Sequence, residues 1–146
     1  MAYTNPYSAY RDTAVKTASQ GKLVVMLYQG ACRELSAAQM CFAADGTIAA
    51  RNIESYGKHI AKAQEIIGEL QTSLDMDKGG QIAQNLMALY VYFNRELMDA
   101  SINKDKTKLD FVLNMMGQLT LAWETASNST ANAPAQNVAP TLNITG

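Results

Sequence analysis

Residues 75–80, with the sequence DMDKGG, begin like a calcium-binding loop. A calcium loop of the EF-hand type needs an oxygen ligand at its fifth position and a bidentate glutamate at its twelfth. Here the fifth position is Gly79 and the twelfth is Leu86, so two ligands are missing. The glycines also lack the Gly-x-x-x-x-Gly-Lys spacing of a phosphate-binding loop. The sequence therefore predicts a turn here, with neither a metal site nor a nucleotide site.

The single histidine, His59, is the sharpest candidate for catalysis. Lys62 follows it three residues later, and this is the spacing found in histidine phosphotransfer domains, which are four-helix bundles of similar size. The next residue is Ala63, where those domains usually have glycine. On a helical wheel His59 lies about 60° from the centre of the core face, at its boundary. A boundary histidine beside a solvated lysine is far commoner than a phosphotransfer pair. Phosphotransfer through His59 is therefore the alternative hypothesis.

Other catalytic sites would need more histidines or better-placed nucleophiles. A di-iron bundle uses two Glu-x-x-His pairs, and one histidine cannot supply both. No serine or cysteine has a sequence context that recommends it as a nucleophile beside His59. Cys32 and Cys41 are nine residues apart on one predicted helix, about 13.5 Å along its axis and on opposite faces, so they cannot form a disulfide. We expect free packing thiols in a reducing compartment, no enzyme activity and no cofactor.

The composition is that of a globular protein. The 146 residues are 48% hydrophobic and 17% charged, with a net charge of −1. A chain of this length can bury a hydrophobic core that is stable without a bound metal or disulfide bonds. The charge balance argues against nucleic-acid binding, which needs clustered Lys and Arg. Because the sequence shows no signal peptide and no run of 18 apolar residues, we expect a cytoplasmic protein without membrane insertion.

Hydrophobic periodicity predicts an all-α protein. The four expected helices cover residues 19–42, 48–73, 81–102 and 106–127. Helices joined by short connections pack antiparallel, so the expected fold is an up-down-up-down four-helix bundle. Residues 1–18 carry spaced tyrosines and are expected to form an N-terminal arm on the bundle, within one domain, residues 1–127. Residues 128–146 carry no charge and no hydrophobic period, so we expect a disordered C-terminal tail.

Two of the predicted helices have more apolar surface than one core face explains. Helix 19–42 has a second stripe about 110° round the wheel from the first, made of Val24, Tyr28, Ala31, Leu35 and Phe42. Helix 81–102 has a second stripe made of Ala83, Met87, Tyr90 and Met98. Either these helices are buried on two sides, or the second stripes wait for a partner. Because adaptable Met and rigid Tyr line grooves for apolar peptides, the second reading predicts a peptide-binding surface.

An ordered set of short motifs runs from about Asn5 to Trp123. It consists of Asn5-Pro6-Tyr7-x-x-Tyr10, Val15-x-Thr17-Ala18-Ser19, Met26-Leu27-Tyr28-x-Gly30-Ala31, Leu74-Asp75, Gly79-Gly80-x-Ile82-Ala83-x-Asn85-Leu86, Leu89-Tyr90-x-Tyr92, Leu109, Leu119 and Trp123. With this set the chain resembles the flagellar secretion chaperone family, the export chaperones of flagellin. The resemblance implies a four-helix bundle that binds the disordered C-terminal segment of flagellin, prevents its premature polymerisation and aids its delivery to the flagellar export apparatus.

The resemblance also implies where partners bind. The N-terminal arm, with Tyr7 and Tyr10, would cover a groove until the client displaces it. We predict that the client contacts Tyr7, Tyr10, Val24, Tyr28, Leu35, Ile53, Ile60, Ile82, Asn85, Leu86, Tyr90 and Phe93. The export gate and other flagellar regulators are further implied partners, and the expected state is a monomer or weak homodimer. The alternatives are the phosphotransfer bundle using His59 and a structural bundle whose second stripes are buried in a homodimer.

Overall fold

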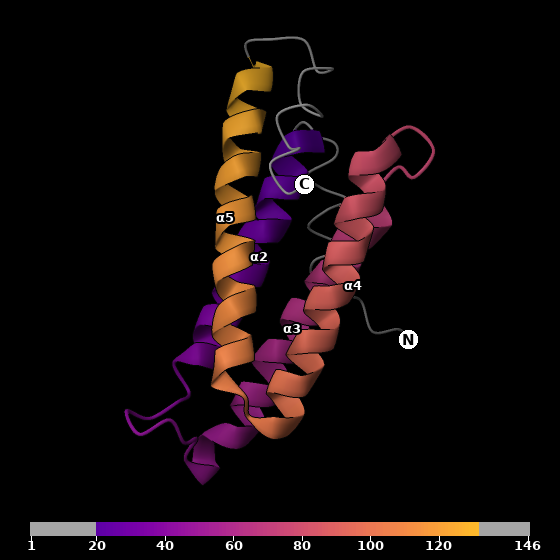
Figure 1. The fold of residues 1–146 in the computed structure, drawn as a ribbon. Coiled ribbons are helices and arrows are strands. Elements are labelled where there is room, and N and C mark those ends of the chain that lie inside the picture. Colours follow the sequence, from indigo (N-terminus) through magenta and orange to yellow (C-terminus); the bar gives the residue numbers. More distant parts are fainter. Residues whose placement is uncertain (1–19, 132–146) are drawn as a thin grey trace, which may run out of the picture.

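The structure is a computed structural model that describes residues 20–131. These residues form four helices, α2 (Gln20–Gln39), α3 (Ala50–Ser73), α4 (Gly80–Asn103) and α5 (Lys106–Ala131), and no strand. Each helix runs opposite to the one before it, so the described residues form the expected up-down-up-down bundle (Figure 1). The expected arm, residues 1–18, and residues 132–146 of the expected tail lie outside the described residues. Residues 128–131, which we assigned to the tail, continue helix α5.

The four helices pack as a closed ring. Helix α2 contacts both α3 and α5, and α4 contacts the same two helices. Helices α2 and α4 therefore lie diagonally opposite each other. The position of α2 between two neighbours explains its two apolar stripes, because a helix with a neighbour on each side must bury both of those sides.

Local chemistry sets the helix ends. Helix α2 ends at Gln39, three residues before the predicted end, because Phe42 pairs with Ile48 in an isolated antiparallel bridge that closes the next turn. Within that turn Gly46 adopts a positive φ of 86°, which glycine allows without a side-chain clash. Thr47 donates its hydroxyl to Asp45 Oδ1 within the turn, and the residue before the first turn of α3 is Ala49. Asp105 caps the start of α5, since its Oδ1 accepts the backbone N–H of Lys108 at 3.2 Å.

Aromatic and aliphatic side chains from all four helices fill the core. The largest that are fully buried are Tyr28, Tyr56, Tyr90, Phe93, Leu23, Leu27, Leu35, Ile60, Ile66, Ile67, Leu70 and Leu97. Burying a side chain such as Leu or Ile contributes about 1.5–3 kcal/mol to folding. The Tyr56 hydroxyl is satisfied in this setting because it donates to the carbonyl oxygen of Ala100 at 2.6 Å, which also ties α3 to α4.

The structure corrects the view that the second stripe of α2 waits for a partner. Its members Val24, Tyr28, Ala31 and Leu35 are all buried within this chain, between α3 and α5. Tyr90, the central residue of the second stripe of α4, is buried as well. Of the two readings left open by the sequence, burial on two sides is therefore correct for these residues. Among the residues of the two second stripes, Met98 is the one large hydrophobic side chain that is half exposed.

Candidate partner-binding surface

Most of the predicted client contacts are core residues. Tyr7 and Tyr10 lie outside the described residues. Seven of the other ten are buried, namely Val24, Tyr28, Leu35, Ile60, Leu86, Tyr90 and Phe93. Ile82 and Asn85 are half-buried near the start of α4, and Ile53 on α3 is 42% exposed. A folded bundle therefore offers a partner direct access to only three of the ten, Ile53, Ile82 and Asn85.

The outer face of α4 is unusually apolar for a solvent-facing helix surface. Val91, Met98 and Ile102 are 50%, 50% and 64% exposed. Their spacing of seven and four residues places them on one side of the helix, away from the ring centre. Arg95 is the only charged residue among the exposed residues of α4, and its guanidinium lies 5.5 Å from the centre of the Tyr92 ring. Exposed apolar residues that gather in this way mark interaction surfaces.

Small residues on α3 leave space on the same side of the bundle. Around Gly57 and Gly68 no atom lies within 4 Å of the position that a Cβ would occupy. Two hydrogen bonds fix the alignment of α3 against α4, from Gln64 Nε2 to the Asn94 carbonyl and from Gln71 Nε2 to Met87 Sδ. Because the helices are antiparallel, this alignment brings Gly68 level with residues 90–91 and Gly57 level with residue 101. No side chain therefore projects from these two positions of α3 beside α4.

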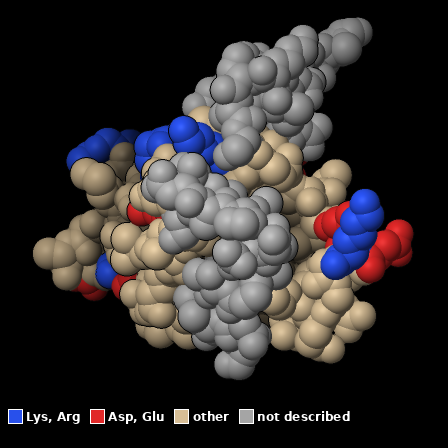
Figure 2. All heavy atoms as spheres, turned by 90° about the horizontal axis from the view of Figure 1, so that it is seen from above, with Lys and Arg blue, Asp and Glu red and all other residues tan. Residues whose placement is uncertain are grey.

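We call this region the α3–α4 surface and define it by Ile53, Gly57, Gly68, Val91, Met98 and Ile102. Its seam contains one unsatisfied polar atom, the buried Oδ1 of Asn94, which has no hydrogen-bond partner among the described residues. Leaving such an oxygen unpaired costs about 1–3 kcal/mol. Seen from above, at the end of the bundle, the described charged side chains lie mainly towards the edges of the molecule (Figure 2).

His59 is part of an interhelical contact. Its Nδ1 lies 2.9 Å from Oε1 of Glu34 on α2, and both side chains are more than half buried. The contact accounts for Glu34, a charged residue on the otherwise apolar arc of its helix. Nothing in the sequence pattern linked these two residues, because they are 25 positions apart on different helices. The polar pair joins α2 to α3 at the rim of the core.

The remaining candidates for chemistry have structural roles. Asp75 Oδ1 accepts the backbone N–H groups of Asp77 and Lys78, so this carboxylate closes the turn before α4. Gly79 is required there because a Cβ would lie 2.6 Å from the Asp75 carbonyl oxygen. Both cysteines are free, as expected, and burial raises the pKa of the Cys32 thiol. Within residues 20–131 no three His, Cys, Asp or Glu side chains gather as a metal site would require.

The fold and the exposed apolar residues define a class, that of antiparallel helical bundles with an apolar surface available to another polypeptide. Comparison with known proteins narrows this class. The model of the family described as flagellar protein FliS matches residues 3–130. The chain therefore belongs to the FliS family. None of the helices formed by residues 20–131 has the length and apolar content needed to cross a bilayer.

Individual relatives agree with this assignment. The flagellar secretion chaperone FliS of Bacillus subtilis (strain 168) is 32% identical over 129 residues, which cover 88% of this chain and 91% of that protein. The flagellar secretion chaperone FliS of Salmonella typhimurium is 34% identical over 117 residues, which cover 80% of this chain and 82% of that protein. The flagellar secretion chaperone FliSB of Pseudomonas aeruginosa is 31% identical over 117 residues, which cover 80% of this chain and 88% of that protein. These relatives are named as chaperones and not as enzymes, which agrees with the expected absence of catalysis.

Sequence reasoning missed most of the α3–α4 surface. It selected residues from the apolar stripes of the helices, including the second stripes, and most of these residues are buried in the core. The usable signal was the spacing of Val91, Met98 and Ile102 on one side of α4, about 100° round the helix from Tyr90, combined with the absence of acidic residues among them. On α3 the matching signal was the pair of glycines, Gly57 and Gly68, inside a long helix. Glycine in a helix interior lowers stability by about 1 kcal/mol relative to alanine, so its presence there indicates another role.

Proposed function

We propose that this protein is a cytoplasmic export chaperone that binds the disordered C-terminal segment of flagellin, prevents its premature polymerisation and aids its delivery to the flagellar export apparatus. The secretion chaperones among its relatives support this function. The observation that carries it is the α3–α4 surface, where Val91, Met98 and Ile102 stay exposed although the core of the bundle is already filled.

Physically the proposed mechanism is coupled folding and binding. A disordered client loses conformational entropy when it docks, so the chaperone must offer apolar area in return. The client segment would lie as a short amphipathic helix along α4, with its apolar side on Val91 and Met98 and its backbone close to the glycines of α3. Because flagellin is expected to self-associate through the same segment, occupation of that segment would block assembly by competition.

The surface proposed for the client also changes the set of proposed contacts. Ile53 remains a direct contact in the proposal, because it belongs to the α3–α4 surface and is partly accessible. Ile82 and Asn85 are accessible but lie on another side of α4, since Ile82 is nine residues, about 180° of helix rotation, from Val91. The buried members of the earlier set would act by holding the bundle in shape. Tyr7 and Tyr10 keep their proposed role as a cover for the groove. The export gate and other flagellar regulators remain proposed partners, and the proposed state is a monomer or weak homodimer.

Charge substitutions on the α3–α4 surface test this function. Val91→Lys and Met98→Lys place a cation in the proposed contact, and both positions are half exposed, so the fold should tolerate them. We expect each to weaken binding of a fluorescent flagellin C-terminal peptide at least tenfold, about 1.4 kcal/mol, in an anisotropy titration. Ser36→Lys is the matched control, because Ser36 is exposed on α2, the helix diagonally opposite α4. Equal affinity for all three variants would exclude the α3–α4 surface.

A further inference from the structure

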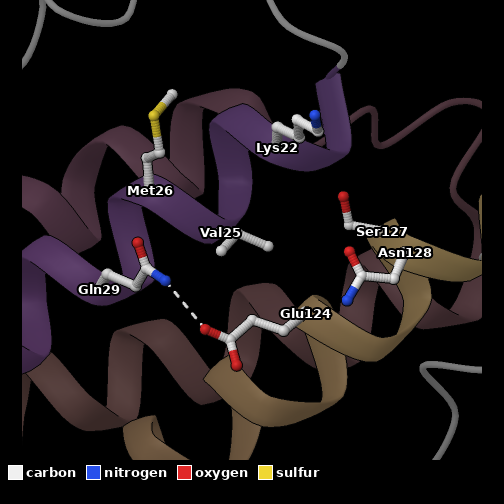
Figure 3. Close-up of a pocket in the computed structure, with 7 residues that line it drawn as sticks. All are labelled: Lys22, Val25, Met26, Gln29, Glu124, Ser127 and Asn128. Atoms are coloured by element: carbon white, nitrogen blue, oxygen red, sulfur yellow. Dashed lines mark hydrogen bonds between the residues drawn. The ribbon is translucent and has the colours of Figure 1, made fainter. Parts of the chain in front are cut away.

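One buried oxygen where α3 meets α4 has no hydrogen-bond partner among the described residues, and it is Oδ1 of Asn94. Polar side chains elsewhere in the bundle are paired. Where α2 meets α5, Gln29 Nε2 donates to Glu124 Oε2 at 2.9 Å (Figure 3). The buried hydroxyl of Thr120 on α5 donates to the carbonyl oxygen of Met116 at 2.7 Å. Because native proteins pair most of their buried polar atoms, the unpaired oxygen of Asn94 needs an explanation.

Asn94 lies beside the apolar residues of the α3–α4 surface. Val91 precedes it by three residues and Met98 follows it by four, and residues at these spacings are neighbours on one side of a helix. The residue as a whole keeps some accessible surface although its Oδ1 is buried, so its side chain lies at the edge of the seam. A client that covers both Val91 and Met98 must therefore pass over Asn94.

The α3 side of the seam supplies no donor to this oxygen. Gln64, which lies level with Asn94, directs its Nε2 to the backbone carbonyl oxygen of Asn94 instead, at 3.2 Å. The residues one turn before and one turn after Gln64 are Ala61 and Gly68, and neither has a polar side chain. No atom lies within 4 Å of the position that a Cβ would take on Gly68. A donor from outside the chain would therefore have room to approach Asn94 from the side of Gly68.

A helical client can supply this donor mainly from its side chains, because its backbone N–H groups beyond the first turn are used inside the helix. The uncharged side-chain donors are the hydroxyls of serine and threonine and the amides of asparagine and glutamine. We propose that Asn94 Oδ1 accepts a hydrogen bond from such a side chain of the flagellin client, and that Asn94 is thereby a specificity-determining residue of the α3–α4 surface. This inference rests on the proposed function, in which the client covers that surface.

The unpaired oxygen makes the surface selective among apolar peptides. A peptide without a donor at this point would cover Asn94 and leave its oxygen unpaired away from water, which disfavours binding. A peptide with lysine or arginine at this point would have to lose the hydration of its charge beside Val91 and Met98. The Arg95 guanidinium on the same helix would also repel that charge. A hydroxyl or an amide avoids both costs.

The test couples a change in the full-length protein to single changes in the peptide. Asn94→Leu removes the amide with little change in side-chain size, and a fluorescent flagellin C-terminal peptide is titrated by anisotropy. We expect Asn94→Leu to bind about fivefold more weakly than the wild-type protein, about 1 kcal/mol, although leucine makes the surface more apolar. Each serine, threonine, asparagine and glutamine of the peptide is then changed to alanine in turn. One of these changes should weaken binding about fivefold with the wild-type protein and less than about twofold with Asn94→Leu.

Two further variants serve as controls. Asn114→Leu makes the same change at an exposed position of α5 and should bind the peptide within about twofold of the wild-type protein. Asn94→Ala removes the amide without adding bulk, so it should show the same insensitive peptide position even where leucine disturbs the packing of the seam.

Two results overturn the inference alone. In one, Asn94→Leu and Asn94→Ala bind the peptide as tightly as the wild-type protein or more tightly, which would mean that a bound water or nothing pairs with the oxygen in the complex. In the other, no change in the peptide loses its effect in these variants. If the peptide does not bind the wild-type protein, the proposed function fails and the inference fails with it. The first two results still show peptide binding, so the two kinds of failure are distinguishable.

Discussion

The hydroxyl oxygens of Tyr28 on α2 and Tyr90 on α4 lie 2.6 Å apart in the buried centre of the bundle. They connect the two helices that lie diagonally across the ring. The Trp123 ring of α5 adds to the cluster, with its centre 6.1 Å from that of Tyr28. Two residues from the second apolar stripes of the sequence therefore meet each other inside the protein. Their polar tips satisfy one another, which is why tyrosine can occupy a position with no exposed surface.

Removing one hydroxyl of this pair should destabilise the fold. In Tyr28→Phe the Tyr90 hydroxyl loses its partner while it stays buried, and we expect the free energy of unfolding in urea to fall by about 1–3 kcal/mol. The double variant Tyr28→Phe/Tyr90→Phe removes both polar groups, so it should lose less than the sum of the two single variants. Additive losses in the double-mutant cycle would show that the two hydroxyls do not interact.

Stability should also fall at high pH. Burial raises the pKa of Tyr28 to about 12 and that of Tyr56 to about 12, and it raises the pKa of Tyr90 as well. In the unfolded chain tyrosine ionises near pH 10. Between these values the unfolded state has released protons that the folded state still holds, so the contribution of these tyrosines is complete below about pH 10 and is lost towards pH 12. Urea titrations at pH 8, 10 and 11 should show this decline.

A matched control separates these tyrosines from general alkaline effects. In Tyr28→Phe/Tyr90→Phe two of the three groups no longer titrate, so the decline in unfolding free energy above pH 10 should be shallower than in the wild-type protein. An equal slope in both proteins would assign the alkaline loss to other groups.

Helix positions and most core residues could be predicted from the sequence, but the exposed surface could not. Periodicity places Tyr56, Ile60 and Ile67 in the core because local spacing determines which residues share a helix face. It cannot show how many neighbours a helix has, and α2 has one on each of two sides. For that reason Tyr28 looked like a surface residue. The His59–Glu34 contact depends on packing between two helices that are distant in the sequence, which short motifs do not encode.

We expect the glycines of α3 to lower the stability of the bundle and to leave space for the client. Because nothing lies within 4 Å of a Cβ built on Gly68, Gly68→Ala should raise the free energy of unfolding by about 0.5–1 kcal/mol through its higher helix propensity. A large side chain there would stand over the α3–α4 surface, so Gly68→Phe should fold but bind the flagellin peptide at least tenfold more weakly. Undiminished peptide binding by Gly68→Phe, measured by anisotropy, would mean that the client does not approach α3.

His59 should not accept a phosphoryl group. The ring nitrogen Nδ1 is held 2.9 Å from the Glu34 carboxylate, whose negative charge disfavours an added phosphoryl group beside it. Incubation with acetyl phosphate should leave the protein unlabelled by mass spectrometry, with a histidine phosphotransfer protein as the positive control. Labelling that disappears in His59→Gln would support the phosphotransfer alternative instead.

Photo-cross-linking tests the central claim, the position of the client, most directly. A photoreactive phenylalanine derivative is placed at residue 98 on the α3–α4 surface or at residue 36 on α2, and each protein is irradiated with the flagellin C-terminal segment. The account predicts a cross-link from position 98 to the segment and none from position 36. Cross-linking from position 36, or its absence at position 98 while the segment remains bound, would contradict it.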